Sequence, residues 1–234
     1  MQHIMPSPFY AVIFDLDGVL ADSEPWWNQI DAKLLAQYGV SYRGEYHRNV
    51  LGVNYRLAVE FYKNAFHIPA SVDELMRRRG EIATEFFANH VVLFAAAKAT
   101  LEQLLGMNLP LAVATSSVSA SARPLLDRTG IRSCFSVVIT GDEVERGKPA
   151  PDIYLRAADE LGISPEACLV VEDSLAGIAA GKAADMRVAA IPDRRFVDPQ
   201  AYEKKADYLI GSLSEIPNLI RQVNAVATEA HALR

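Results

Sequence analysis

Two aspartates, Asp15 and Asp17, stand one residue apart directly after a short apolar run and are followed by Gly18. Two such carboxylates repel each other when both are buried and ionised, and a divalent cation bound between them relieves that cost. Hard oxygen ligands suit Mg²⁺ in particular, and glycine lets the backbone turn sharply and approach a ligand closely. The stretch therefore has the chemistry of a nucleophilic or metal-binding carboxylate pair, although aspartate and glycine are also common in turns that close a strand.

Three further stretches place polar groups at the ends of apolar runs or in a stiff loop. Thr115 and Ser116 follow one apolar run, and hydroxyls there can bond phosphate oxygens or cap the next helix. Lys148 lies between a glycine and a proline, which makes it a fixed cation suited to a phosphoryl group. Glu172 and Asp173 form a second acid pair, which would complete a Mg²⁺ shell with the first.

Short β-rich runs alternate with helical stretches over most of the chain. The predicted strands cover residues 10–13, 111–114, 137–139, 169–171, 188–191 and 208–210. This alternation favours an α/β fold, with a mostly parallel sheet and helices on both faces. Because parallel strands end at one edge, the acid pairs, hydroxyls and lysine are brought together there. We interpret the four stretches together as one functional site.

Residues 22 to about 90 have a different character, because their apolar residues recur at helical spacing and no convincing strand is present. Pro25 is placed to open the first helix, and Gly39 to end it. We predict a small α-helical cap domain at 22–90, inserted into an α/β core of residues 1–21 and 91–234. The arginine run 77–79 is interpreted as part of one solvated helix face.

Helix ends in the core are also marked in the sequence. Gly130 and Gly162 fit C-terminal positions, and Ser174 fits the N-cap of a helix that runs to about residue 184. The final stretch, 218–234, predicts an amphipathic helix.

The composition limits the classes of partner and compartment. The 234 residues are half hydrophobic and carry a formal net charge of −6, which argues against nucleic acid or an acidic membrane surface as the main partner. Two cysteines without a Cys-x-x-Cys spacing suit a reducing cytosol. We find no signal peptide and no apolar stretch long enough to cross a bilayer, and we expect a cytoplasmic monomer.

The order of these motifs resembles the haloacid dehalogenase (HAD)-like superfamily of phosphotransferases, which has a three-layer α/β/α core with a Rossmann-like sheet. The four motifs of that family match, in chain order, residues 15–19, Thr115, Lys148 and 172–173. The stretches 147–154 and 172–178 resemble the subgroup of β-phosphoglucomutases and sugar-phosphate phosphatases, in which a helical cap lies between the first two motifs.

The resemblance implies a role for each matching residue. Asp15 would attack phosphorus and form an aspartyl-phosphate, and Asp17 would act as general acid and base. The phosphoryl oxygens would be bound by three residues, Thr115, Ser116 and Lys148. Mg²⁺ would be held by Asp15, the backbone carbonyl of Asp17 and Asp173, with Glu172 in support.

The same resemblance leaves the phosphoryl acceptor open. Trp27 stands where the mutases carry a cap histidine, and because tryptophan cannot transfer protons, water is the favoured acceptor. The first hypothesis is therefore a Mg²⁺-dependent phosphatase of a small phosphorylated metabolite, with sugar phosphates as the favoured class. Trp27 would either face the sugar or pack within the cap. Arg56 is a candidate for binding a second phosphate because its surroundings resemble the substrate loop of the mutases. The alternative is a β-phosphoglucomutase-type phosphomutase. A third hypothesis, a binding protein without catalysis, fits least because every motif position holds a competent residue.

Overall fold

The structure, a computed structural model, describes residues 7–50 and 55–232. Its main feature is a six-stranded parallel sheet in the order β5-β4-β1-β6-β7-β8. The strands are β1 (Ala11–Phe14), β4 (Leu111–Ala114), β5 (Val137–Ile139), β6 (Cys168–Glu172), β7 (Arg187–Ala190) and β8 (Tyr208–Leu209). Each predicted strand is present within about one residue of its predicted bounds.

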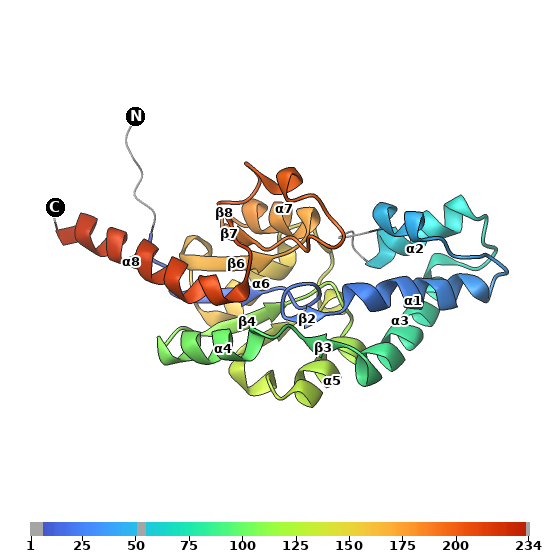
Figure 1. Cartoon of the computed structure of the whole chain (residues 1–234), viewed down its shortest axis with the longest axis horizontal. Helices are drawn as coiled ribbons and strands as arrows, with labels where there is room; N and C mark the ends of the chain where they lie inside the picture. Colours follow the sequence, from blue (N-terminus) through green and yellow to red (C-terminus); the bar gives the residue numbers. More distant parts are fainter. Residues whose placement is uncertain (1–6, 51–54, 233–234) are drawn as a thin grey trace.

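Helices cover both faces of this sheet, so the core has three layers (Figure 1). Alternate residues of β1 face opposite layers: Val12 and Phe14 pack on one side, and Ala11 and Ile13 on the other. The first layer contains α4 (Ala97–Gly106), α5 (Ser119–Thr129) and α8 (Ile216–Ala232). The second contains α6 (Asp152–Leu161) and α7 (Leu175–Ala183). The predicted α/β/α architecture is confirmed.

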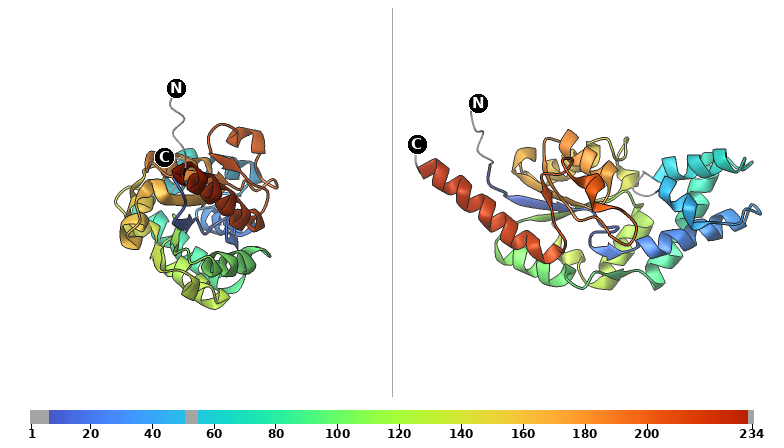
Figure 2. Two further views of the ribbon diagram at one scale, coloured as in Figure 1. Left: turned by 90° about the vertical axis from the view of Figure 1, so that its left-hand side faces the viewer. Right: turned by 45° about the horizontal axis from the view of Figure 1, so that its top comes forward.

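Three helices lie beyond the end of the sheet, at the opposite end of the molecule from the tip of α8 (Figures 1 and 2). They are α1 (Glu24–Ala36), α2 (Tyr55–Ala65) and α3 (Val72–Asn89). Pro25 occupies the first turn of α1 as predicted. At the start of α3 the Ser71 hydroxyl accepts a hydrogen bond from the Glu74 N–H at 3.1 Å. Short 3₁₀ helices cover Gly44–Asn49, Arg132–Cys134, Gly141–Glu143, Pro165–Ala167, Pro199–Tyr202 and Leu213–Glu215.

A pair of two-residue strands connects these helices to the core. β2 (Ala21–Asp22) pairs antiparallel with β3 (Val92–Leu93), so the chain leaves and re-enters the core at neighbouring points. This small sheet was not predicted, because two-residue strands leave no periodic pattern. The division into a core of 1–21 and 91–234 and a cap of 22–90 remains our proposal.

The predicted helix punctuation is confirmed at three positions. Gly130 and Gly162 are the C-cap residues of α5 and α6, with φ of +73° and +68°, and Ser174 is the N-cap of α7. The prediction that residues 77–79 lie on a solvated helix face was wrong for Arg79, which is only 6% exposed. None of the helices in the described part of the chain has the length and hydropathy needed to cross a bilayer.

Candidate active site

Asp15 follows β1, which lies between β4 and β6 in the sheet. Its backbone N–H donates to the carbonyl of Val171 at 3.0 Å, which holds the start of the loop against β6. The residue is 5% exposed, and its Oδ1 accepts a 2.6 Å hydrogen bond from Nζ of Lys148. The predicted nucleophile and the predicted cation are therefore in direct contact.

Lys148 is buried and uses all three of its N–H donors. Nζ donates to Asp15 and to Oε1 of Glu172, both at 2.6 Å, and to the carbonyl of Ala114 at 3.1 Å. Burial alone would lower the pKa of Lys148, but the carboxylates of Asp15 and Glu172 raise it well above its ordinary value. Lys148 is thus a permanent cation at the carboxyl edge of the sheet.

Glu172, the last residue of β6, is fully buried and orients this lysine. Its Oε1 also accepts from the Tyr154 hydroxyl at 2.8 Å, and Oε2 accepts from the N–H and hydroxyl of Ser174 at 2.9 and 3.0 Å. Burial opposes ionisation, but Lys148 and these hydrogen bonds lower the pKa of Glu172. A Cβ at Gly177 would lie 1.6 Å from Oε1, so glycine is needed where α7 passes the carboxylate.

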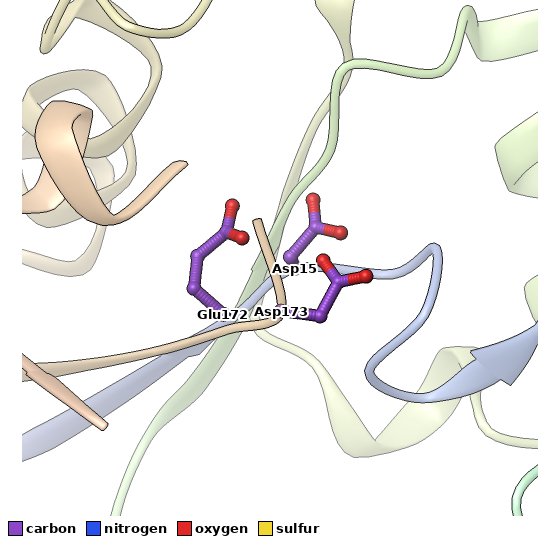
Figure 3. Close-up of side chains that lie close together, drawn as sticks. All are labelled: Asp15, Glu172 and Asp173. Carbon is purple, nitrogen blue, oxygen red and sulfur yellow. The ribbon is translucent and has the colours of Figure 1, made fainter. Parts of the chain in front are cut away.

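Three carboxylates form a cluster beside Lys148. Asp15, Glu172 and Asp173 each offer one oxygen, and these oxygens lie within 4.8 Å of one another. Figure 3 shows the carboxyl groups gathered at the ends of two strands. Gly18, with φ of +74°, makes room for the third acid, because a Cβ there would lie 2.0 Å from Oδ2 of Asp173. Oxygen ligands at this spacing fit a hard divalent cation.

Without a metal, burial and close approach disfavour the ionised form of these carboxyl groups. Burial raises the pKa of Asp15 to about 8; Lys148 opposes the rise, and Glu172 and Asp17 add to it. Burial, followed by repulsion from Glu172 and Asp15, raises the pKa of Asp173 well above its ordinary value. A divalent cation displaces protons from such carboxylates, so the electrostatics as well as the geometry fit a metal.

Asp17 is not a member of this cluster and has hydroxyl partners instead. Its Oδ2 accepts from Oγ of Ser117 at 2.7 Å and from Oγ1 of Thr115 at 3.2 Å. Oδ1 is buried and has no hydrogen-bond partner in the part of the chain that the structure describes. One carboxyl oxygen is thus oriented by two hydroxyls, whereas the other has no partner among the described residues. The predicted metal contact through the Asp17 carbonyl remains a prediction.

The hydroxyl run after β4 does not cap α5, which was the alternative interpretation. The N-cap residue of α5 makes no side-chain cap bond; Oδ1 of Asp142 accepts from the Ser119 N–H at 2.9 Å instead. Thr115 is fully buried, and its Oγ1 accepts from the Ser117 N–H at 3.0 Å. Ser116 lines the cavity described next. The hydroxyl side chains after β4 therefore lie at the acidic site and do not act as caps of α5.

A cavity of about 310 Å³ joins the sheet edge to α1–α3. We call the lining residues that belong to α1, α2 and α3 the cap wall. They include Trp27, Asp31, Tyr55 and Arg79. All core residues predicted for the site line this cavity: Asp15, Asp17, Thr115, Ser116, Lys148, Glu172 and Asp173.

The two cap residues that we predicted differ in position. Trp27 lines the cavity, as expected. Arg56 is not among the lining residues: its side chain is 52% exposed and pairs with Asp73 at 2.8 Å. The structure gives no support to the predicted role of Arg56, and another arginine, Arg79, reaches the cavity.

Asp31 and Arg79 were missed, although the sequence carries a signal for both. Asp31 follows Trp27 by four residues and so shares its helix face, next to the buried Leu34. Arg79 follows Leu75 by four residues and therefore lies on the apolar face of α3. A charged residue on the buried face of each of two helices indicates a buried ion pair.

Comparison with known proteins agrees with this arrangement. The family profile described as haloacid dehalogenase-like hydrolase matches residues 12–191. The chain is 34% identical over 174 residues to the phosphorylated carbohydrates phosphatase of Thermotoga maritima, which covers 74% of this chain and 81% of that protein. It is 34% identical over 231 residues to the protein CbbY of Rhodobacter capsulatus, covering 94% and 96% of the two chains.

Among solved structures, CbbY from Rhodobacter sphaeroides in complex with phosphate superposes with a TM-score of 0.78 at 26% identity, covering 89% of this chain and 96% of that one. The match of the family profile spans most of the chain and includes all four motif positions. This protein belongs to the haloacid dehalogenase-like hydrolases and is a phosphatase of that family.

Proposed function

We propose that this protein is a Mg²⁺-dependent phosphatase that hydrolyses a small sugar phosphate through an aspartyl-phosphate on Asp15. The observation that carries the proposal is the meeting of Asp15, the buried cation of Lys148 and a cluster of metal-competent carboxylates at the base of one cavity. The Thermotoga relative is named for phosphorylated carbohydrates, and the Rhodobacter structure contains phosphate, which supports the substrate class.

In the first step, a carboxylate oxygen of Asp15 attacks phosphorus and the bond from phosphorus to the sugar oxygen breaks. Asp17 gives its proton to the departing oxygen, so the product leaves as a neutral alcohol. The hydrogen bonds from Ser117 and Thr115 hold Asp17 in one orientation for this transfer.

In the second step, water attacks phosphorus of the aspartyl-phosphate, and Asp17 accepts the proton that the water loses. The bond between phosphorus and Asp15 breaks, which restores the carboxylate and releases phosphate. Ser116 and Thr115 are proposed to contact the phosphoryl oxygens. Lys148 contributes mainly its charge, because its three N–H donors already have partners and a phosphoryl oxygen must displace one of them.

The metal belongs to the proposal because it fits the donor set. When bound, Mg²⁺ neutralises charge on the phosphoryl oxygens, and the groups that would hold it are Asp15, Asp173 and the carbonyl of Asp17, with Glu172 behind them. The carboxylate oxygens of Asp15, Glu172 and Asp173, which lie within 4.8 Å of one another, support this assignment, and the raised pKa values of Asp15 and Asp173 agree with it.

Location and assembly are proposed in the same way. We place the activity in the cytoplasm and take the protein to be a monomer. Cys134 and Cys168 are both free thiols, which supports a reducing compartment. Light scattering after size exclusion tests the monomer.

The decisive experiment measures phosphate release from a panel of sugar phosphates with Mg²⁺ and with a chelator. We expect turnover that needs Mg²⁺ and that Asp15→Asn abolishes. Equal turnover by Asp15→Asn would reject the covalent mechanism. The phosphomutase alternative is not favoured, and the same preparations test it. Conversion of β-glucose 1-phosphate to glucose 6-phosphate with a bisphosphate primer, without net phosphate release, would show a mutase and reject the proposed phosphatase.

A further inference from the structure

A buried ion pair on the cap wall joins two of the three helices at the cavity. Nε and Nη2 of Arg79 donate to Oδ1 and Oδ2 of Asp31 at 2.7 and 3.2 Å. The two side chains are 7% and 0% exposed, and both residues line the cavity. A buried ion pair is by itself weak evidence for stability, because desolvation offsets the attraction between the charges. What matters for ligand binding is therefore which hydrogen-bonding groups of Arg79 and Asp31 have no partner.

The unused groups are donors. A guanidinium has five N–H groups, and the hydrogen bonds of the described chain use two of those on Arg79, both toward Asp31. Asp31 also accepts from the Tyr62 hydroxyl at 2.7 Å, so its oxygens take three hydrogen bonds from described residues. The cap wall thus offers N–H donors at a site where the neighbouring carboxylate is already engaged.

Two aromatic rings surround these donors on one side only. The central guanidinium carbon lies 4.5 Å from the ring centroid of Trp27 and 4.6 Å from that of Tyr55. Because the two centroids are only 6.2 Å apart, the rings cannot lie on opposite faces of the guanidinium. The hydroxyl of Tyr55 is buried and has no hydrogen-bond partner within the described residues. Ring surface next to the unused N–H groups of Arg79 suits a sugar, which presents both C–H and O–H groups.

The charges of the cavity decide between a hydroxyl and a second phosphate. Lys148 and Arg79 are the two cations among the described lining side chains. Lys148 is paired with Asp15 and Glu172, and Arg79 is paired with Asp31. A second phosphate would meet no unpaired cation in this part of the chain and would be repelled by Asp31. A neutral hydroxyl oxygen accepts from Arg79 without that penalty.

We propose that Arg79, held by Asp31 and flanked by Trp27 and Tyr55, determines specificity by binding a hydroxyl of an uncharged, polyhydroxylated leaving group. The substrate class is then a sugar or polyol monophosphate, and bisphosphates are disfavoured. This inference rests on the proposed function for the phosphate end of the ligand and adds the recognition of its other end.

The test uses full-length Asp15→Asn protein with Mg²⁺, so that ligands bind without turnover, and measures dissociation constants by calorimetry. The probes are glucitol 6-phosphate, hexyl phosphate and fructose 1,6-bisphosphate, which differ in their hydroxyls and in a second phosphate. We expect glucitol 6-phosphate to bind about 10-fold more tightly than either of the others. Adding Arg79→Lys should remove most of this preference and leave the affinity for hexyl phosphate within about 2-fold.

Two further variants keep the test decisive. Arg77→Lys makes the same change on a neighbour whose side chain is 55% exposed, and it should alter no affinity. Tyr55→Phe keeps the ring and removes one unpartnered hydroxyl, and it replaces Arg79→Lys if that protein does not fold. Equal binding of glucitol 6-phosphate and hexyl phosphate, tighter binding of the bisphosphate, or an equal loss for all three ligands in Arg79→Lys would overturn the proposal. Phosphate release by the wild-type protein, measured separately, tests the proposed function independently of this preference.

Discussion

The hydroxyl of Ser117 donates a 2.7 Å hydrogen bond to Oδ2 of Asp17, although 100 residues separate the two in the sequence. The contact joins the loop after β1 to the loop after β4, two neighbouring strands of the sheet. It orients the carboxyl proposed to protonate the leaving group, and Oδ1 of the same carboxyl remains without a described partner.

Ser117→Ala should therefore impair proton transfer more than phosphate binding. We expect kcat for an alkyl phosphate to fall about 10-fold or more, and the fall to be smaller for p-nitrophenyl phosphate, whose leaving group needs less protonation. Ser116→Ala, which changes a proposed phosphate contact, should affect both substrates alike. Equal losses for both substrates in Ser117→Ala would contradict the orienting role.

Glu172→Gln should destabilise the fold as well as the chemistry. It leaves Lys148 buried beside one fewer carboxylate, and removing one partner from a buried ion pair costs about 3–5 kcal/mol. Urea denaturation of the metal-free protein measures this free energy of unfolding. The control is Glu160→Gln, which removes an exposed partner of Arg156, with both side chains 42% exposed, and should cost less than about 1 kcal/mol. Similar losses for the two variants would count against the proposed importance of burial.

Metal binding should stabilise the protein more at alkaline than at acidic pH. The pKa of Asp15 rises from 3.8 to about 8 on folding, so between these values the folded metal-free protein binds more protons than the unfolded chain. The contribution of Asp15 to the free energy of unfolding of the metal-free protein therefore falls as pH rises through that window. Mg²⁺ must displace those protons, which becomes easier toward pH 8.

Thermal denaturation with Mg²⁺ and with a chelator at pH 6, 7 and 8 checks this expectation. The rise in melting temperature caused by Mg²⁺ should increase across the series. In Asp15→Asn the dependence on pH should shrink, because that titrating group is absent. A stabilisation that is independent of pH would show that the acids of the cluster are ionised without the metal.

Gly18→Ala should lower metal affinity in addition to straining the backbone. An added Cβ would meet Oδ2 of Asp173 at 2.0 Å, and φ at this position is +74°. Gly39→Ala is a matched control, since φ there is +73° and nothing lies within 4 Å of the new Cβ. Each variant should lose about 1–2 kcal/mol from the left-handed backbone, and only Gly18→Ala should bind Mg²⁺ more weakly by calorimetric titration. Unchanged Mg²⁺ affinity in Gly18→Ala would separate Asp173 from the metal.

The sequence predicted the core of the fold well because its signals are local. A buried parallel strand is a short apolar run with turn residues at its ends, so β4 and β5 have their predicted bounds. Gly130 and Gly162 were correct because a left-handed helix end favours glycine. The proximity of the predicted acids to Lys148 was correct because parallel strands share one carboxyl edge.

The features that were missed depend on contacts between distant segments. Arg79 belongs to a run of three arginines, and only the packing of α3 against α1 separates it from its exposed neighbours. Asp142, in the 3₁₀ helix Gly141–Glu143 more than twenty residues away, accepts the hydrogen bond at the start of α5 that a local serine could have accepted. Ser116 and Ser117 are the same residue type at neighbouring positions, so the sequence does not indicate which hydroxyl reaches Asp17. In the structure it is Ser117.

The pairing of β2 with β3 places residues 21 and 22 beside residues 93 and 92. The helical segment between these strands therefore leaves the α/β core and returns to it at one pair of neighbouring strands. A different set of helices could be exchanged there by recombination without shifting the register of any strand in the large sheet. The proposed recognition of the leaving group by these helices can then diverge in evolution while the proposed site of phosphoryl transfer stays the same.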